Sequence, residues 1–150
     1  MHESNIIELL LVEDNPHDLE LALRALRKAN LVNRIQVARD GAEALDFIFG
    51  EGIHAGRELR DGPKMVLLDL KLPKVDGLEV LRRLKSDPRT KMIPVVVLTS
   101  SKEQSDVVES YQLGVNSYIV KPVNFERFTD AVRDLGLYWL LLNQSPVKES

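Results

Sequence analysis

The chain has 150 residues, a length that fits one ordinary domain and is too short for two independent cores. Hydrophobic residues make up 44% and charged residues 29% of the sequence, and the formal net charge of -3 gives no basic field that would favour nucleic acid. The absence of cysteine excludes disulfides and thiolate metal sites. No apolar run approaches membrane-spanning length and the N-terminus lacks a signal-peptide pattern, so we expect a cytoplasmic protein without a membrane segment.

Short apolar runs alternate with segments of helical spacing along the chain. The first helical segment follows Asn15 as N-cap and has Pro16 at its first position. Further helices are predicted near residues 40–50, 77–86, 102–112 and 124–142. The apolar runs have the length and β-branched content of strands and are IELLLV at 7–12, RIQVA at 34–38, MVLLD at 65–69, IPVVVLT at 93–99 and SYIVK at 117–121.

The strands are nearly continuous apolar runs, which is typical of a parallel sheet covered on both faces. Five strand and helix alternations therefore predict an α/β fold with a five-stranded, doubly wound parallel sheet. We expect one domain over residues 1–150, with its core at about 6–142 and an extended or disordered tail at 143–150. Ligands in such folds bind beyond the carboxyl ends of the strands, so the residues at the strand tips are the candidates for function.

Polar side chains occupy four of the five strand tips. Glu13 and Asp14 follow the first strand, Asp69 ends the third, Thr99 ends the fourth and Lys121 ends the fifth. Each alone fits a solvated loop residue or a helix cap, but together they bring three carboxylates, a hydroxyl and an amine to one edge. The carboxylates repel one another unless a cation neutralises them, and all-oxygen ligands favour Mg²⁺. A carboxylate beside Mg²⁺ and an ammonium can attack phosphorus, so Asp69 is the predicted phosphoryl acceptor.

The motifs LLLVEDN, LLDLKLPKVDG, VVVLTSS and YIVKPV, in this order and spacing, resemble the receiver domain of two-component response regulators over residues 6–135. The resemblance implies a flavodoxin-like (CheY-like) (βα)5 fold and phosphorylation of Asp69 by a partner histidine kinase. It also implies that Mg²⁺ is bound by Glu13, Asp14, Asp69 and the backbone carbonyl of Lys71. The protein would then catalyse only its own phosphorylation and dephosphorylation and would not be an enzyme acting on other substrates.

The same resemblance assigns roles to the residues around the acceptor. Thr99 would follow the phosphoryl group, Lys121 would pair with it, and Tyr118 matches the aromatic switch residue of the family. Pro122 would form a cis peptide with Lys121 and aim that lysine into the site; the alternative is a trans turn proline. Gly77 would be a tight-loop glycine after Asp69 or an ordinary helix-start residue.

The resemblance also links two further positions to how long the phosphoryl group survives. Lys71 lies two residues after Asp69, and Ser101 lies two residues after Thr99. Neither side chain is as well suited as an amide to orient an attacking water, so we hypothesise a long-lived phosphoaspartate, which decay within seconds at neutral pH would contradict. The alternative interpretation is that the Lys71 side chain points to solvent.

Nothing after the receiver segment resembles an output domain, so the sequence predicts a stand-alone receiver that signals by contact. We expect a homodimer through the fourth helix, the fifth strand and the last helix, because the last helix is apolar beyond what one sheet face can cover. With the long segment at 50–63, these features resemble receivers that serve phytochrome-type histidine kinases. The alternative is a C-terminal helix packed deeply on its own domain. The core-facing stripe of this helix comprises Phe125, Phe128, Val132, Leu135, Trp139 and Leu142, and it is widened by Leu137, Tyr138, Leu140 and Leu141.

Three other functions are compatible with an α/β sheet. A phosphatase of the haloacid dehalogenase type has its general acid two residues after the nucleophile, where this chain has Lys71. A flavodoxin-like cofactor binder needs a phosphate-cradling loop after the first strand, where the acidic VEDNPHDLE would repel phosphate. A receiver-fold interaction module that works without phosphorylation is the remaining alternative.

Overall fold

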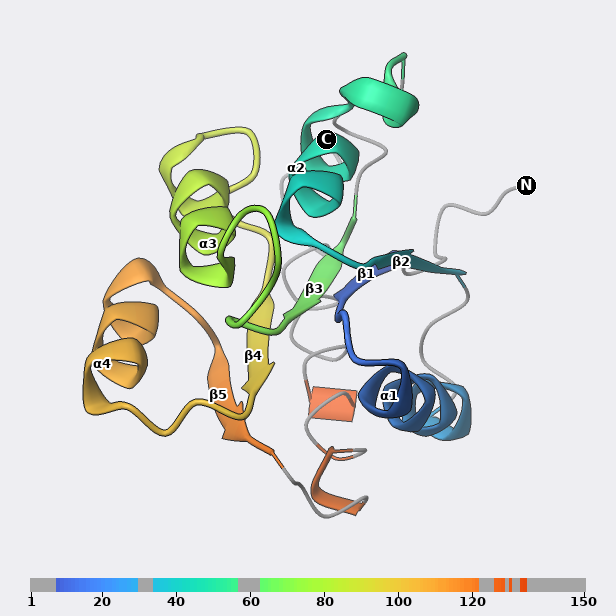
Figure 1. Ribbon diagram of the computed structural model, residues 1–150, viewed down its shortest axis with the longest axis vertical. Coiled ribbons are helices and arrows are strands. Elements are labelled where there is room, and N and C mark those ends of the chain that lie inside the picture. The colour runs from blue at the N-terminus through green and yellow to red at the C-terminus, as the bar shows by residue number, and fades with distance from the viewer. Residues whose placement is uncertain are drawn as a thin grey trace, which may run out of the picture.

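The computed structural model describes residues 8–29, 34–56, 63–121, 126–128, 130, 133 and 134. Among these residues, five strands form one parallel sheet in the order β2-β1-β3-β4-β5. The sheet runs through the centre of the molecule (Figure 1). Its strands are β1 (Glu8–Val12), β2 (Arg34–Ala38), β3 (Met65–Leu68), β4 (Val95–Thr99) and β5 (Ser117–Val120).

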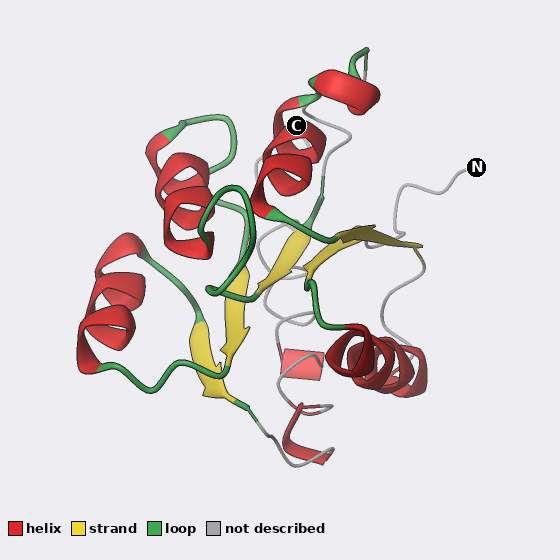
Figure 2. Cartoon of the chain, viewed as in Figure 1, coloured by secondary structure: helices red, strands yellow, loops and turns green. Residues whose placement is uncertain are grey.

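Helices cover both faces of this sheet. Helix α1 lies on one side, and α2, α3 and α4 lie on the other (Figure 2). Each strand alternates its side chains between the two faces, so each face has its own apolar cluster. The helices are α1 (Pro16–Ala29), α2 (Gly41–Phe49), α3 (Gly77–Ser86) and α4 (Gln104–Leu113), with a 3₁₀ turn, η2 (Gly52–His54), after α2.

The apolar clusters on the two faces of the sheet explain why the strand sequences are continuously apolar. Leu9 and Leu11 of β1 pack against α1, while Leu10 and Val12 of the same strand face the α2 and α3 side. All four are at most 2% exposed, so both faces of the central strand are sealed from water. Phe128, in the helical residues near the C-terminus, is buried in the α1 cluster. The predicted doubly wound parallel sheet is therefore confirmed.

Side chains cap the first turns of three helices, and Asn15 is the cap that the sequence predicts. The Asn15 side chain accepts a hydrogen bond from the Asp18 amide at 2.9 Å, as an N-cap does. Helices α2 and α3 are capped in the same way by the side chains of Asp40 and Asp76. The fourth strand begins at Val95 and not at Ile93, because Pro94 has no N–H to donate. The loop 57–62, Pro122, most of the predicted last helix and the tail 143–150 lie outside the described residues.

The loop between β3 and α3 turns back tightly over the end of β3. The Gly77 amide donates a hydrogen bond to the Leu70 carbonyl oxygen at 2.8 Å. A Cβ atom at Gly77 would lie 2.3 Å from the carbonyl oxygen of Asp69, so no larger residue fits without moving the backbone. The interpretation of Gly77 as a tight-loop glycine is the one that the structure supports. Its close approach fixes the backbone of Asp69 at the sheet edge.

Lys85 near the end of α3 should make stability depend on pH. Its Nζ donates hydrogen bonds to the carbonyl oxygens of Lys91 and Ile93 at 2.9 and 2.8 Å, which serve the neutral amine as well as the ammonium. Burial lowers the pKa of Lys85 from 10.5 to about 8. The unfolded chain then binds more protons between these two values, so the Lys85 contribution to the free energy of unfolding should rise with pH across this window and stay constant below it.

Urea unfolding of the wild type and Lys85→Met between pH 7 and 10 measures this contribution. The free energy of unfolding should rise more steeply with pH in the wild type than in the variant. Parallel curves for the two proteins would contradict the burial of this amine.

Candidate phosphoacceptor and metal site

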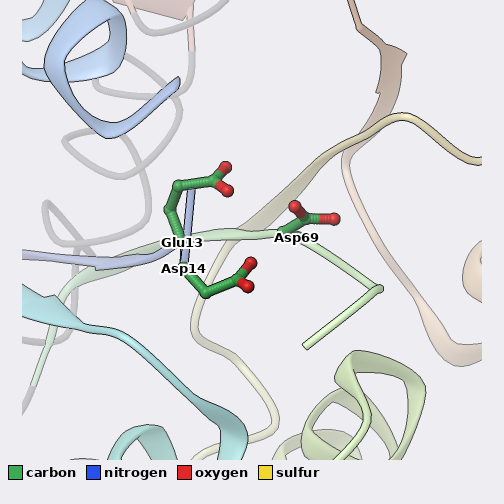
Figure 3. A group of neighbouring side chains, drawn as sticks. All are labelled: Glu13, Asp14 and Asp69. Atoms are coloured by element: carbon green, nitrogen blue, oxygen red, sulfur yellow. The ribbon is translucent and has the colours of Figure 1, made fainter. Parts of the chain in front are cut away.

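Three carboxylates meet where the strand order reverses. Strands β2 and β3 flank β1, so the tips of β1 and β3 lie at the topological switch point of the sheet, where ligands of such folds bind. Glu13 and Asp14 project from the end of β1 and Asp69 from the end of β3, with their carboxyl groups facing a common space (Figure 3). One ligand oxygen from each lies within 4.8 Å of the others. The predicted convergence of these three acids is confirmed.

The ammonium of Lys121 reaches into this cluster from the end of β5. Its Nζ lies 2.9 Å from Glu13 Oε1 and 3.0 Å from Asp69 Oδ2. The Lys121 amide also donates to the Thr99 carbonyl oxygen at 2.8 Å, which extends the β4 and β5 pairing by one bond and directs the side chain toward the site. The lysine therefore joins the predicted site residues as expected.

Asp18 is a partner of Lys121 that the sequence did not single out. Its Oδ2 lies 2.8 Å from Lys121 Nζ. It lies in the first turn of α1, where an acid is usually explained by the helix dipole. The signal that could have found it is its place five residues after the β1 tip, on the helix that starts over the site. Lys121 thus balances three carboxylates from α1 and the tips of β1 and β3.

Burial and charge shift two pKa values within the cluster. The pKa of Glu13 rises from 4.5 to about 7, chiefly because burial penalises its charge, with Asp69 adding to the rise and Lys121 opposing it. Burial lowers the pKa of Lys121, but hydrogen bonds to Asp18, Glu13 and Asp69 outweigh burial and raise that pKa above the ordinary value. The ammonium is therefore charged at neutral pH, while Glu13 is close to its titration point.

The donor set fits a hard divalent cation. Glu13, Asp14 and Asp69 offer oxygen atoms only, and the described part of the chain places no thiolate or imidazole among them. Glu13 and Asp69 are buried, whereas Asp14 is exposed, so the cluster has a closed side and a side open to water. Burial and the neighbouring charge of Asp69 both disfavour the charged form of Glu13, and a bound cation would offset both effects. The role of the Lys71 carbonyl stays a prediction.

Asp69 is held in place by contacts on both of its carboxylate oxygens. Its backbone N–H donates to the Val12 carbonyl oxygen at 3.1 Å, which ties the residue to β1. Its Oδ1 accepts from the Lys71 amide at 3.1 Å, and its Oδ2 accepts from Lys121 Nζ. Asp69 is 5% exposed, so little side-chain movement is open to it. This is a preorganised carboxylate beside a charged donor.

Thr99 and Tyr118 are joined through Ser101. The Ser101 amide donates to Thr99 Oγ1 at 3.3 Å, and the Tyr118 hydroxyl donates to the Ser101 carbonyl oxygen at 3.1 Å. Thr99 is fully buried at the end of β4, and Tyr118 is half-buried in β5. The structure thus brings the two predicted switch residues to one loop between β4 and α4.

The side chain of Lys71 has a partner that the sequence did not indicate. Its Nζ lies 3.4 Å from Asp106 Oδ2, in the first turn of α4. The same oxygen accepts a hydrogen bond from Ser101 Oγ at 2.5 Å. The interpretation that Lys71 simply points to solvent is therefore wrong: the side chain is 54% exposed, but its ammonium is paired.

The arrangement agrees with what the chain matches among known proteins. A family model described as the response regulator receiver domain matches residues 9–133. The chain belongs to the response regulator receiver family. The receiver has the CheY-like fold of two-component signalling. Within its described residues, no helix is both long and apolar enough to cross a membrane.

Two curated relatives match most of the receiver. The probable methanogenesis regulatory protein FilR2 of Methanothrix harundinacea is 47% identical over 139 residues, which cover 92% of this chain and 86% of that protein. The response regulator Rcp1 of Synechocystis is 39% identical over 132 residues, which cover 88% of each.

Solved structures of response regulators are also similar to this chain. The bacteriophytochrome response regulator RtBRR is 55% identical with a TM-score of 0.77, covering 87% of this chain and 78% of that one. The phosphorylated cyanobacterial phytochrome response regulator RcpA is 41% identical with a TM-score of 0.77, covering 90% and 94%. The Mn²⁺-bound form of Rcp1 is 38% identical with a TM-score of 0.76, covering 89% and 94%. The receiver is therefore similar to regulators associated with phytochromes.

Proposed function

We propose that this receiver is a cytoplasmic response regulator that accepts a phosphoryl group on Asp69 from a phytochrome-type histidine kinase. The observation that carries the proposal is the fixed position of Asp69 between the Lys71 amide and the Lys121 ammonium, at 3.1 and 3.0 Å, beside two further acids. The similarity to Rcp1 and to the phosphorylated phytochrome response regulator RcpA supports the phytochrome assignment.

In the proposed reaction, a carboxylate oxygen of Asp69 forms a bond to the phosphorus of a phosphohistidine. The bond between phosphorus and the imidazole nitrogen breaks, and the nitrogen keeps the electron pair. Lys121 stabilises the negative charge that develops on the phosphoryl oxygens, because its ammonium is already positioned and charged. Glu13 and Asp18 also contact the ammonium, at 2.9 and 2.8 Å, and hold it in place.

Glu13, Asp14, Asp69 and the Lys71 carbonyl would hold the metal, which we propose to be Mg²⁺. When bound, the cation would neutralise charge shared between the acids and the incoming phosphoryl group. The Mn²⁺-bound form of Rcp1 supports a divalent ion in a similar receiver. The oxygen-only donor set of this chain supports the choice of Mg²⁺.

The signal would leave the site through Thr99 and Tyr118. Phosphorylation would draw Thr99 Oγ1 from the Ser101 amide toward the phosphoryl group and would shift the loop whose carbonyl Tyr118 contacts. That loop leads into α4, where Val108 and Tyr111 are 43% and 51% exposed and lie one turn apart. We propose that α4, β5 and the last helix form a phosphorylation-dependent interaction surface and the contact of a homodimer.

Tyr118→Ala should separate uptake of the phosphoryl group from its effect. The Asp69 site does not use this side chain, so we expect the rate of phosphorylation to stay within about threefold of the wild type. The change in sedimentation coefficient caused by a beryllofluoride mimic should be lost, because the link from β5 to Ser101 is removed. Tyr118→Phe, which removes only the hydroxyl, is the matched comparison. Loss of phosphorylation itself would show that the role of Tyr118 is misassigned.

Phosphotransfer from a labelled kinase tests the proposed partner. A phytochrome-type histidine kinase and an unrelated histidine kinase are each phosphorylated and mixed with the wild type or Asp69→Asn. We expect rapid transfer from the phytochrome-type kinase to the wild type only. Equal transfer from both kinases would contradict the phytochrome assignment.

Sedimentation tests the proposed homodimer. A strict monomer, with and without beryllofluoride, would contradict it.

A further inference from the structure

Asp106 is a buried carboxylate that lies outside the acidic cluster at the strand tips. It is 7% exposed and lies in the first turn of α4. Its Oδ2 contacts donors from two different loops: Ser101 Oγ at 2.5 Å and Lys71 Nζ at 3.4 Å. One of these residues lies two positions after the phosphoacceptor and the other two positions after Thr99. Asp106 therefore connects α4 to the two loops that flank the phosphoacceptor, and we ask how it affects phosphorylation of Asp69.

The Lys71 ammonium can reach either Asp106 or a phosphoryl group on Asp69. The Lys71 amide nitrogen lies 3.1 Å from Asp69 Oδ1. Its Cα is one N–Cα bond, about 1.5 Å, further along, so the flexible stem starts beside the acceptor. With 54% of the side chain exposed, the stem has room to turn on its solvent side. In the structure the ammonium lies 3.4 Å from Asp106 Oδ2.

We propose that Asp106 is a positioning residue that holds the Lys71 ammonium on α4, away from the phosphoryl oxygens, and thereby slows phosphorylation of Asp69. The proposal rests on the proposed function of Asp69 as the acceptor. Without the carboxylate, the ammonium pairs with the transferring group, where added positive charge stabilises the transition state. A partner that moves α4 away from the β3–α3 loop would release Lys71 in the same way. The rate of phosphorylation would then depend on what binds α4.

Acetyl phosphate is the probe for this effect because it is a small anionic donor. An Asp69 oxygen forms a bond to phosphorus, the bond from phosphorus to the acetate oxygen breaks, and acetate leaves with the electron pair. One additional ammonium near this group should raise the rate about three- to tenfold. The gain should shrink at high ionic strength, because salt screens the attraction.

The experiment compares the wild type, Asp106→Asn, Lys71→Met and the double variant, by intact-protein mass after mixing with acetyl phosphate and Mg²⁺. Asparagine has nearly the same shape and still accepts the Ser101 hydrogen bond, so the loop is kept in place. We expect Asp106→Asn to raise the rate in the Lys71 background and to change it less than about twofold in the Lys71→Met background. Asp106→Glu, which keeps the charge, should restore the slower rate.

Glu109→Gln is the matched control because it removes the same charge one turn further along α4. Glu109 pairs with Arg82 of α3, so the Glu109→Gln variant should be phosphorylated at the wild-type rate. Equal gains from Asp106→Asn in both backgrounds, or a fast Asp106→Glu, would overturn the proposal. If the wild type takes up no phosphoryl group, both the proposed function and this inference are contradicted.

Discussion

Lys121→Met should lower the rate of Asp69 phosphorylation by about 100-fold or more, the scale of loss when one preorganised donor to a developing charge is removed. The ammonium contacts Asp69, Glu13 and Asp18 at 3.0 Å or less, and methionine keeps much of its length without its charge. Mg²⁺ binding should be retained, because the three acids at the strand tips remain and lose a competing cation. Time courses of the phosphoryl adduct and calorimetric titration with Mg²⁺ measure the two effects separately.

Lys91→Met is the control for a general loss of positive charge. Lys91 lies exposed between α3 and β4, at the opposite end of the parallel sheet from the strand tips. The Lys91→Met variant should be phosphorylated on Asp69 at the wild-type rate. A Lys121→Met protein that is phosphorylated at the wild-type rate would contradict the role given to this ammonium.

Gly77→Ala should both destabilise the fold and impair phosphorylation. The new Cβ would lie 2.3 Å from the Asp69 carbonyl oxygen and 2.5 Å from the Leu70 Cα, and neither backbone atom can move without shifting the acceptor. We expect the free energy of unfolding to fall by about 2 to 4 kcal/mol. The rate of phosphorylation should fall as well, because Asp69 loses its alignment with Lys121. Urea unfolding and the adduct time course measure both effects.

Gly114→Ala separates crowding at the site from the general cost of losing a glycine. Gly114 ends α4 with φ at 104°, and the nearest atom to a Cβ there is 4.0 Å away. Only the left-handed backbone opposes alanine, at a cost of about 1 to 2 kcal/mol. Phosphorylation should be unaffected. Equal rates for the two alanine variants would contradict the close fit of Gly77 over Asp69.

Most of the fold could be predicted because the apolar pattern has one physical solution. Strands such as LLLV in β1 carry apolar side chains on both faces, which requires helices on both sides of the sheet. Parallel strands bring their carboxyl ends to one edge, so Glu13, Asp69 and Lys121 could be placed together from their positions alone. The acceptor could be predicted from the third strand, because Asp69 directly follows Leu68, the last residue of that strand.

Asp18 and Asp106 could not be predicted in the same way. Both are acids in the first turn of a helix, where a favourable interaction with the helix dipole already explains them. Helical spacing says which residues share a face, but it does not say how far the helix is rotated over the site. Packing settles that rotation, and it places Asp18 on Lys121 and Asp106 on Lys71. The partners of the two lysines are therefore a property of the folded chain.

Intact-protein mass after incubation with acetyl phosphate, with and without Mg²⁺, tests the central claim most directly when wild type and Asp69→Asn are compared. We predict a single phosphoryl adduct on the wild type that requires Mg²⁺ and is absent from Asp69→Asn. An adduct that persists in Asp69→Asn would contradict the assignment of the acceptor. The absence of any adduct, also with a phosphorylated histidine kinase as donor, would instead favour a receiver-fold interaction module that works without phosphorylation.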